Sequence, residues 1–160
     1  MKLIAHRGNR WGQEKELENT SDYLEDAINQ GFDVEIDLWV RGEECFLGHD
    51  AEGEEIDFDW LMDYSEYLWI HCKNLEALYA LSYAVDDLNY FWHEQDDYTL
   101  TSQGMIWTYP YKPVTNKSVV VCKSLLECRQ HALIGEGLVR KFMKSMQPYG
   151  ICSDYFGLVE

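Results

Sequence analysis

The segment from residue 32 to residue 41 constrains the fold more than any other part of this sequence, because apolar and acidic side chains alternate along it. Side chains two residues apart lie on the same face of a β-strand. One face therefore carries Glu35 and Asp37 together. The opposite face is wholly apolar and consists of Val34, Ile36 and Leu38. An apolar face on one side leaves the two carboxylates facing either the interior of a barrel or a functional site.

Strand-like and helix-like segments alternate through the first half of the chain. Strands are expected at residues 3–8, 32–41 and 68–73, and helices at about 20–30, from 58 and from 75 onward. This order is typical of parallel βαβ units. A short strand at residues 45–49 would be an accessory to them.

The second half shows mostly strands. They are expected at residues 90–93, 98–101, 105–109, 118–122 and 151–154, with helical segments starting at Ser124 and at Leu138. The eight strands outside the accessory one predict a single domain over residues 1–160. The expected fold class is α/β, a small, irregular TIM (β/α)8-like barrel with several outer helices missing in its second half, since a complete barrel takes ~200 residues or more. A smaller open α/β sheet is the alternative.

The composition of the chain limits the classes of partner that the protein is expected to bind. The formal net charge of −16 would repel a nucleic-acid backbone, and an anionic substrate would need local positive charge. No segment is apolar enough for a membrane span or a signal peptide. The five cysteines show no CxxC spacing, which favours buried thiols in a reducing compartment. We therefore expect a cytoplasmic protein that binds neither nucleic acid nor membrane.

Histidines recur near the ends of the expected strands, where parallel α/β folds build their sites: His6, His49, His71 and His93. Buried carboxylates at Glu35 and Asp37 need a counter-charge, which a divalent metal such as magnesium, calcium or manganese would supply. Surface placement is the alternative for these carboxylates. Arg7 and Lys73 are candidate phosphate anchors, although a solvent-exposed charge is the commoner fate of such residues.

An ordered set of motifs resembles the glycerophosphodiester phosphodiesterase family, which belongs to the phospholipase-C-like TIM-barrel phosphodiesterases. The motifs are His6-Arg7-Gly8, Glu18-Asn19-Thr20, Glu35-x-Asp37 and His49-Asp50, with Ser153-Asp154-Tyr155 resembling a closing motif of the family. The resemblance implies Glu35 and Asp37 as metal ligands and His6 and His49 as an acid/base pair. His71 stands where the family usually has a third carboxylate, so a transition metal becomes an option.

The resulting hypothesis is metal-dependent hydrolysis of a small glycerol- or sugar-linked phosphodiester by histidine acid/base catalysis. The attacking group is either water or a hydroxyl of the substrate. Further residues expected at the pocket are Glu18, Asn19, His93, Trp107 and Asp154. The alternative is a non-catalytic module that binds a phosphate ligand on a degenerate barrel.

Overall fold

The structure is a computed structural model, and it describes residues 1–83, 87–122 and 148–156. Residues 1–83 are called the N-terminal half here, and the other described residues the C-terminal half. The N-terminal half contains β1 (Lys2–His6), α1 (Ser21–Asn29), β2 (Asp33–Arg41), β3 (Glu44–Leu47), β4 (Glu55–Ile56), α2 (Phe58–Asp63), β5 (Leu68–Cys72) and α3 (Leu75–Tyr83). The C-terminal half contains β6 (Tyr90–Phe91), β7 (Tyr98–Leu100), β8 (Ile106–Thr108), β9 (Ser118–Cys122) and β10 (Gly150–Ser153).

The eight strands expected from the sequence, and the accessory strand, are all present. Strand β4 was not expected, and the helical segments expected from Ser124 and Leu138 lie outside the described residues. The parallel βαβ prediction is confirmed, because β1, β2, β5 and β6 pair as parallel neighbours in that order. On the other side of β1 the parallel pairing continues through β10, β9 and β8, and β7 joins β8 antiparallel.

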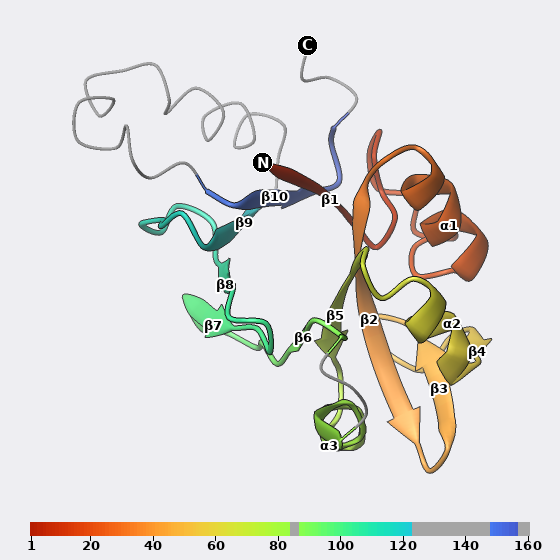
Figure 1. The fold of residues 1–160 in the computed structure, drawn as a ribbon. Helices are drawn as coiled ribbons and strands as arrows, with labels where there is room; N and C mark the ends of the chain where they lie inside the picture. The colour runs from red at the N-terminus through yellow and green to blue at the C-terminus, as the bar shows by residue number, and fades with distance from the viewer. Residues whose placement is uncertain (84–86, 123–147, 157–160) are drawn as a thin grey trace, which may run out of the picture.

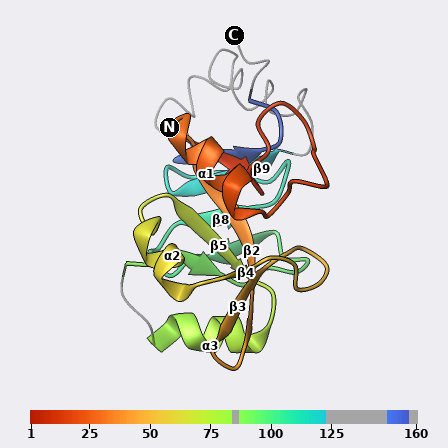
Figure 2. The ribbon, with the colours of Figure 1, turned by 90° about the vertical axis from the view of Figure 1, so that its right-hand side faces the viewer.

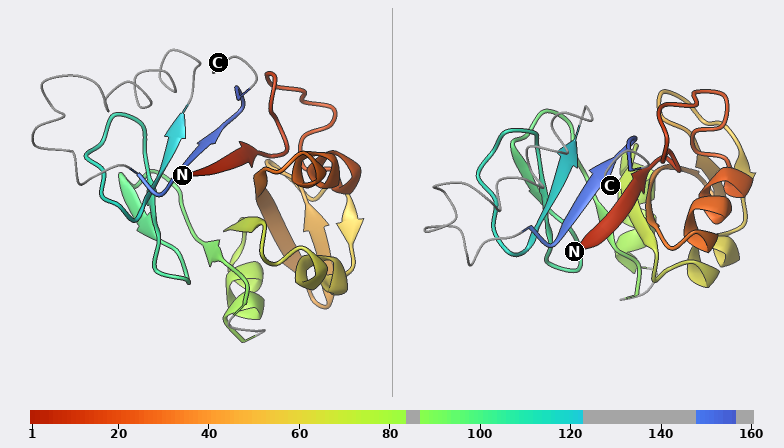
Figure 3. Two further views of the ribbon diagram at one scale, coloured as in Figure 1. Left: turned by 45° about the horizontal axis from the view of Figure 1, so that its top comes forward. Right: turned by 90° about the horizontal axis from the view of Figure 1, so that it is seen from above.

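These strands belong to one mixed sheet of ten strands, in which β3 and β4 extend from β2 as an antiparallel hairpin. Figure 1 shows the other eight strands following one another around a ring, and Figure 3 shows β9, β10 and β1 side by side. Among the described residues, no strand ladder joins β6 to β7. The described sheet is therefore not closed by strand pairing.

Hydrogen bonds of another kind link β6 to the β7 segment. The hydroxyl of Ser102 accepts a bond from the Tyr90 amide at 3.0 Å, and the Ser102 amide donates to the Tyr90 carbonyl at 2.8 Å. The Thr99 hydroxyl donates to the carbonyl of Trp92 at 2.8 Å. The two ends of the sheet thus lie next to each other, joined by one backbone bond and by the hydroxyls of Ser102 and Thr99 rather than by a regular ladder.

The alternation in β2 sorts its side chains as the sequence predicts. Val34, Ile36 and Leu38 are fully buried in the largest apolar cluster, which the helices also enter. Figures 1 and 2 show the helices outside the ring, beside β2 and β5. Glu35 and Asp37 are also buried, at 3% and 0% exposure, so the surface alternative for these carboxylates is wrong.

Aromatic side chains form a second buried cluster, which links the two halves. Trp107 packs between Phe91 and Trp69, with ring centroids 4.5 Å and 6.0 Å away. Phe91 in turn stacks on the imidazole of His71, with centroids 5.3 Å apart and rings nearly parallel. The imidazole of His71 therefore rests on an aromatic layer.

None of the helices in the described part of the chain has the length and apolar character that a bilayer span requires. Cys45 and Cys72 are buried free thiols, as the cysteine spacing predicts.

Candidate functional site

A cavity of about 600 Å³ lies where the C-terminal ends of the parallel strands meet. Nine of the residues singled out in the sequence line it: His6, Arg7, Glu35, His49, His71, Lys73, His93, Trp107 and Asp154. Asp37, Glu18 and Asn19 are not in the lining, but each contacts a residue that is: Asp37 contacts His49, and Glu18 and Asn19 contact Arg7. The structure thus brings the whole predicted set together around one cavity.

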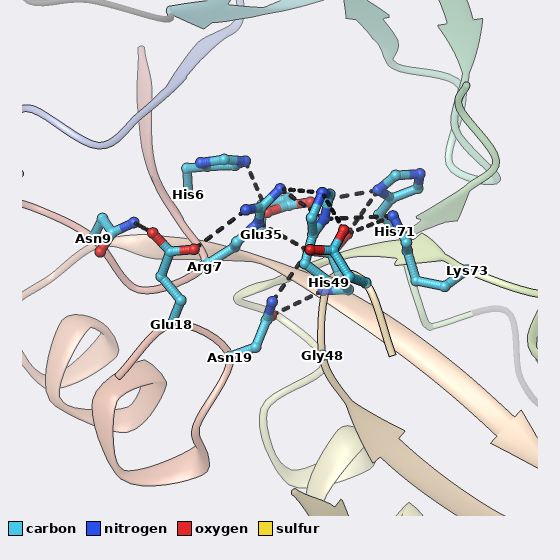
Figure 4. Close-up of polar contacts among 12 residues, drawn as sticks. His6, Arg7, Asn9, Glu18, Asn19, Glu35, Gly48, His49, His71 and Lys73 are labelled. Carbon is cyan, nitrogen blue, oxygen red and sulfur yellow. Dashed lines mark hydrogen bonds and ion pairs between the residues drawn. The ribbon is translucent and has the colours of Figure 1, made fainter. Parts of the chain in front are cut away.

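Glu35, Asp37 and His71 form the polar centre of this cavity. Each offers one ligand atom within 4.8 Å of the others. The parallel register of β2 and β5 explains this, because it places Asp37 directly beside His71 while Glu35 precedes Asp37 on the same strand face. Figure 4 shows Glu35, His49 and His71 converging above the strands.

The carboxylate of Asp37 is surrounded by donors. Oδ1 lies 2.9 Å from Nδ1 of His71 and 3.4 Å from Nζ of Lys73. Oδ2 lies 2.9 Å from Nε of Arg7, and it also contacts His49 and Asn19, each at 3.1 Å. Burial alone would raise the pKa of Asp37, but the bonds from His49 and His71 and the charge of Arg7 hold it well below its usual range. Asp37 is therefore the permanent negative charge of the site.

Glu35 contrasts with its neighbour. Burial and the negative charge of Asp37 raise its pKa. Its Oε2 atom is buried and has no hydrogen-bond partner among the described residues, although Nε2 of His6 lies 3.8 Å away. A buried carboxylate oxygen without a partner is costly, and a cation would satisfy it.

The tautomer of His71 follows from its contacts. Nε2 lies 2.8 Å from the carbonyl oxygen of His93, which can only accept, so Nε2 carries a hydrogen. Nδ1 then faces carboxylate oxygens of Asp37 and Glu35, at 2.9 Å and 3.9 Å. A neutral imidazole would aim its lone pair at these oxygens, which is unfavourable unless a proton or a metal ion lies between them. A backbone carbonyl that fixes the outer nitrogen is also the usual support of a metal-binding histidine.

The contacts of Glu35 and of His71 both bear on whether these residues fit a divalent ion. Oε2 of Glu35 lacks a donor, and Nδ1 of His71 lies 3.9 Å from the other oxygen of the same carboxylate, Oε1. Two carboxylates and one imidazole form a mixed oxygen and nitrogen set, which suits manganese or zinc as well as magnesium. The donor set therefore fits the metal that the sequence predicts.

His6 and His49 occupy different surroundings. Nδ1 of His6 contacts Oδ1 of Asp154 at 2.8 Å. Burial would lower the pKa of His6, but the negative charge of Glu35 and the bond to Asp154 raise it. Asp154 is buried too, and its bond to His6 helps to keep the pKa of its carboxyl below the usual value.

His49 is the more exposed histidine, with 41% of its side chain accessible. It follows β3 in a tight turn, where the Gly48 amide donates to the Asp37 carbonyl at 3.1 Å and the Trp39 indole donates to the Gly48 carbonyl at 2.7 Å. Gly48 has a φ of 151°, and a side chain there would collide with the carbonyl of Ala51. This turn carries His49 over the cavity.

Arg7 links the histidines to the acidic centre. Its guanidinium donates to Glu18 at 3.2 Å, and its Nη2 atom lies 2.8 Å from Nδ1 of His49, in addition to its contact with Asp37. Arg7 and Asn19 both have a positive φ, of 54° and 57°, and the Asn19 amide donates to the Arg7 carbonyl at 3.2 Å. Such strain in non-glycine residues often accompanies functional sites.

The opposite wall of the cavity comes from the C-terminal half and includes His93, Glu94, Trp107 and Tyr109. Trp107 is only 4% exposed, so its main contribution is to the aromatic layer.

Sequence reasoning missed Asn9 and Gln13. The Asn9 amide donates to Glu18 at 2.9 Å and to Asp154 at 2.8 Å, and the Gln13 amide donates to Asp154 at 3.0 Å. The only signal for Asn9 was its position directly after His6-Arg7-Gly8.

No family model, curated protein or solved structure matches this chain. The family resemblance therefore rests on the motifs alone, and the functional argument rests on the geometry of the site.

Proposed function

We propose that this protein is a metal-dependent phosphodiesterase that hydrolyses a small glycerol- or sugar-linked phosphodiester. The observation that carries the proposal is the cluster of Glu35, Asp37 and His71, which lies at one cavity together with three further imidazoles and two cationic side chains. We further propose that the strands form a small TIM-like barrel closed between β6 and β7, supported by the bonds of Ser102 and Thr99.

Arg7 and Lys73 would bind the substrate's phosphate oxygens. Both line the cavity and lie against Asp37, whose negative charge holds them in place. In a protein with a net charge of −16, this local positive charge is what makes an anionic substrate acceptable. A divalent ion bound by Glu35, Asp37 and His71 would add Lewis-acid stabilisation of the charge that develops on those oxygens.

His6 and His49 would move the protons. One removes the proton of the attacking hydroxyl or water, and the other protonates the leaving alkoxide. His6 reaches the cavity from the end of β1, and His49 reaches it from the turn after β3, so the two imidazoles enter from different elements. Water and a hydroxyl of the substrate are both acceptable nucleophiles in this arrangement.

The cavity limits the substrate. A volume of about 600 Å³ suits a small diester, and a sugar or glycerol group would rest on Tyr109, which is exposed, since Trp107 is nearly buried. The cytoplasm is the proposed location, which the buried free thiols of Cys45 and Cys72 support.

A chromogenic diester such as bis(p-nitrophenyl) phosphate tests the proposal. Turnover should require added manganese, magnesium or zinc, and it should disappear with a chelator. Glu35→Gln should abolish metal-dependent turnover, whereas Glu43→Gln, in an exposed turn far along the hairpin, should leave it unchanged. Turnover that a chelator does not affect would contradict the proposed role of the metal.

A non-catalytic phosphate-binding module is the second candidate, and one observation favours it. Arg7, Lys73, His49 and His71 already contact Asp37, so its charge is balanced without a metal. Binding of the diester without turnover in any of the three metals, measured by calorimetry, would decide for the module.

A further inference from the structure

We propose that Asp154 is a positioning residue for His6, fixing the imidazole in the tautomer that presents Nε2 to the cavity. The inference rests on the proposed function in taking His6 as a proton-transfer group. Asp154 comes from the end of β10, close to the C-terminus of the chain, and His6 is the last residue of β1.

The contact between the two side chains defines the tautomer. Oδ1 of Asp154 lies 2.8 Å from Nδ1 of His6. An ionised carboxylate only accepts hydrogen bonds, so Nδ1 must carry the hydrogen. The free nitrogen is then Nε2, which lies on the side of Glu35, 3.8 Å from its Oε2 atom. The reactive nitrogen of His6 is thereby directed at the proposed metal cluster.

Hydrogen-bond donors on neighbouring residues hold the carboxylate of Asp154 in place. The Asn9 amide donates to the same Oδ1 atom at 2.8 Å, and the Gln13 amide donates to Oδ2 at 3.0 Å. The backbone amide of Gly12 donates to the Asp154 carbonyl at 2.9 Å. The residue is 4% exposed, so these bonds are largely shielded from water. Both carboxylate oxygens are accounted for, which leaves one orientation for the group.

The sheet explains why residues 148 positions apart meet. Strands β1 and β10 are parallel neighbours, and their register pairs Ala5 with Ser153. The next residue on each strand is therefore His6 beside Asp154, at the edge where the cavity opens. This partnership depends on long-range strand pairing, and the motif around His6 does not contain it.

The Asn9 amide extends the same arrangement to the phosphate anchor. It donates to Glu18 at 2.9 Å as well as to Asp154, and Glu18 pairs with Arg7 at 3.2 Å. The orientation of His6 and that of Arg7 are thus tied to one fully buried side chain. Loss of Asp154 would leave one hydrogen of this buried amide without its acceptor.

Nitrogen-15 NMR of the His6 ring tests the proposal directly in the full chain, at a pH where the imidazole is neutral. The wild-type protein should show Nδ1 protonated, with a downfield proton resonance from the bond to Asp154. In Asp154→Ala, the hydrogen should redistribute to Nε2. In Asp154→Asn, which keeps the size of the side chain, the Nδ1 proton resonance should move upfield. Asp33→Asn is the matched control, because Asp33 is equally buried but binds Lys2 and Trp69 instead.

With bis(p-nitrophenyl) phosphate as substrate, kcat of Asp154→Ala should fall by about 10²–10⁴-fold while KM stays within a few-fold, since both phosphate anchors, Arg7 and Lys73, remain in place against Asp37. An unchanged tautomer in Asp154→Ala, or an unmoved Nδ1 resonance in Asp154→Asn, would overturn the proposal. Because the NMR result needs no turnover, it stands apart from the proposed function. A wild-type protein with the predicted tautomer and no hydrolysis would refute only the phosphodiesterase.

Discussion

The two halves of the molecule are built differently around one cavity. The N-terminal half has three helices and a central strand of nine residues. The C-terminal half has strands of two to five residues, and no helix occurs within residues 87–122. Both cationic residues of the cavity lining, Arg7 and Lys73, and three of its four histidines come from the first half. The second half contributes Glu94, aromatic rings and two hydrogen-bond acceptors, Asp154 and the carbonyl of His93.

Each of these two acceptors orients a histidine that belongs to the first half. The carbonyl of His93 sets the tautomer of His71, and Asp154 sets that of His6. The first half thus carries the groups proposed to do the chemistry, and the second half orients them.

The largest expected effect is on turnover, from a change in the N-terminal half. In His49→Ala, kcat for bis(p-nitrophenyl) phosphate should fall by about 10²–10⁴-fold, because one of the two proton-transfer groups is removed. The free energy of unfolding in urea should change by less than about 0.5 kcal/mol, since the imidazole is substantially exposed.

Glu55→Ala is the matched control on the same hairpin, because Glu55 is exposed on β4. It should preserve both turnover and stability. Full turnover in a folded His49→Ala protein would remove His49 from the mechanism. It would also contradict the proposal that the N-terminal half carries both proton-transfer groups.

Trp107→Ala should show the opposite profile, as a change in the C-terminal half. The indole is 4% exposed and packs against Phe91 and Trp69, so its removal should cost about 3–5 kcal/mol of unfolding free energy. Trp11→Ala, at a tryptophan that is 65% exposed, should cost less than about 0.5 kcal/mol. Equal stabilities of the two variants would show that the aromatic layer does not hold the halves together.

Local sequence patterns predicted the strands well. The period-2 alternation of β2 identified both its apolar face and its buried carboxylates, since side-chain direction follows from the strand itself. The positions of His6, Glu35, Asp37 and His71 followed from the same logic, because parallel strands place their C-terminal ends at one edge.

Features that depend on long-range pairing could not be predicted this way. The bond between His6 and Asp154 requires β10 to pair with β1, and the bond between Ser102 and Tyr90 requires the ends of the sheet to meet. The Glu54 carboxylate accepts from the Ser21 amide at 2.9 Å at the start of α1, where the N-cap residue Thr20 makes no side-chain capping bond. In each of these contacts, the sequence around one residue gives no indication of which residue will be its partner.

The link between β6 and β7 provides a smaller test. Ser102→Ala removes the hydroxyl that bonds to Tyr90 and to Leu88, and it should lower the unfolding free energy by about 1 kcal/mol. Amide hydrogen exchange at Tyr90 should accelerate with it. Ser82→Ala should leave both quantities unchanged, because among the described residues the exposed Ser82 hydroxyl bonds within its own helix, to Tyr79. Unchanged exchange at Tyr90 in Ser102→Ala would argue for an open sheet.

The smallest expected effect is a pH dependence of the unfolding free energy. It involves both halves, because His6 and Asp154 come from different halves. Burial opposes the charged form of His6, but Glu35 and Asp154 outweigh it and raise the pKa of His6 above its ordinary value of 6.5. The folded state therefore binds this proton more tightly than the unfolded state does. The resulting stability is fully present below the unfolded value and is lost as the pH rises through the folded value. Urea unfolding of the metal-free protein across this range should show the decline, Asp154→Asn should weaken it, and His6→Asn should remove it. A decline of the same size in wild type and His6→Asn would assign the pH dependence to another group.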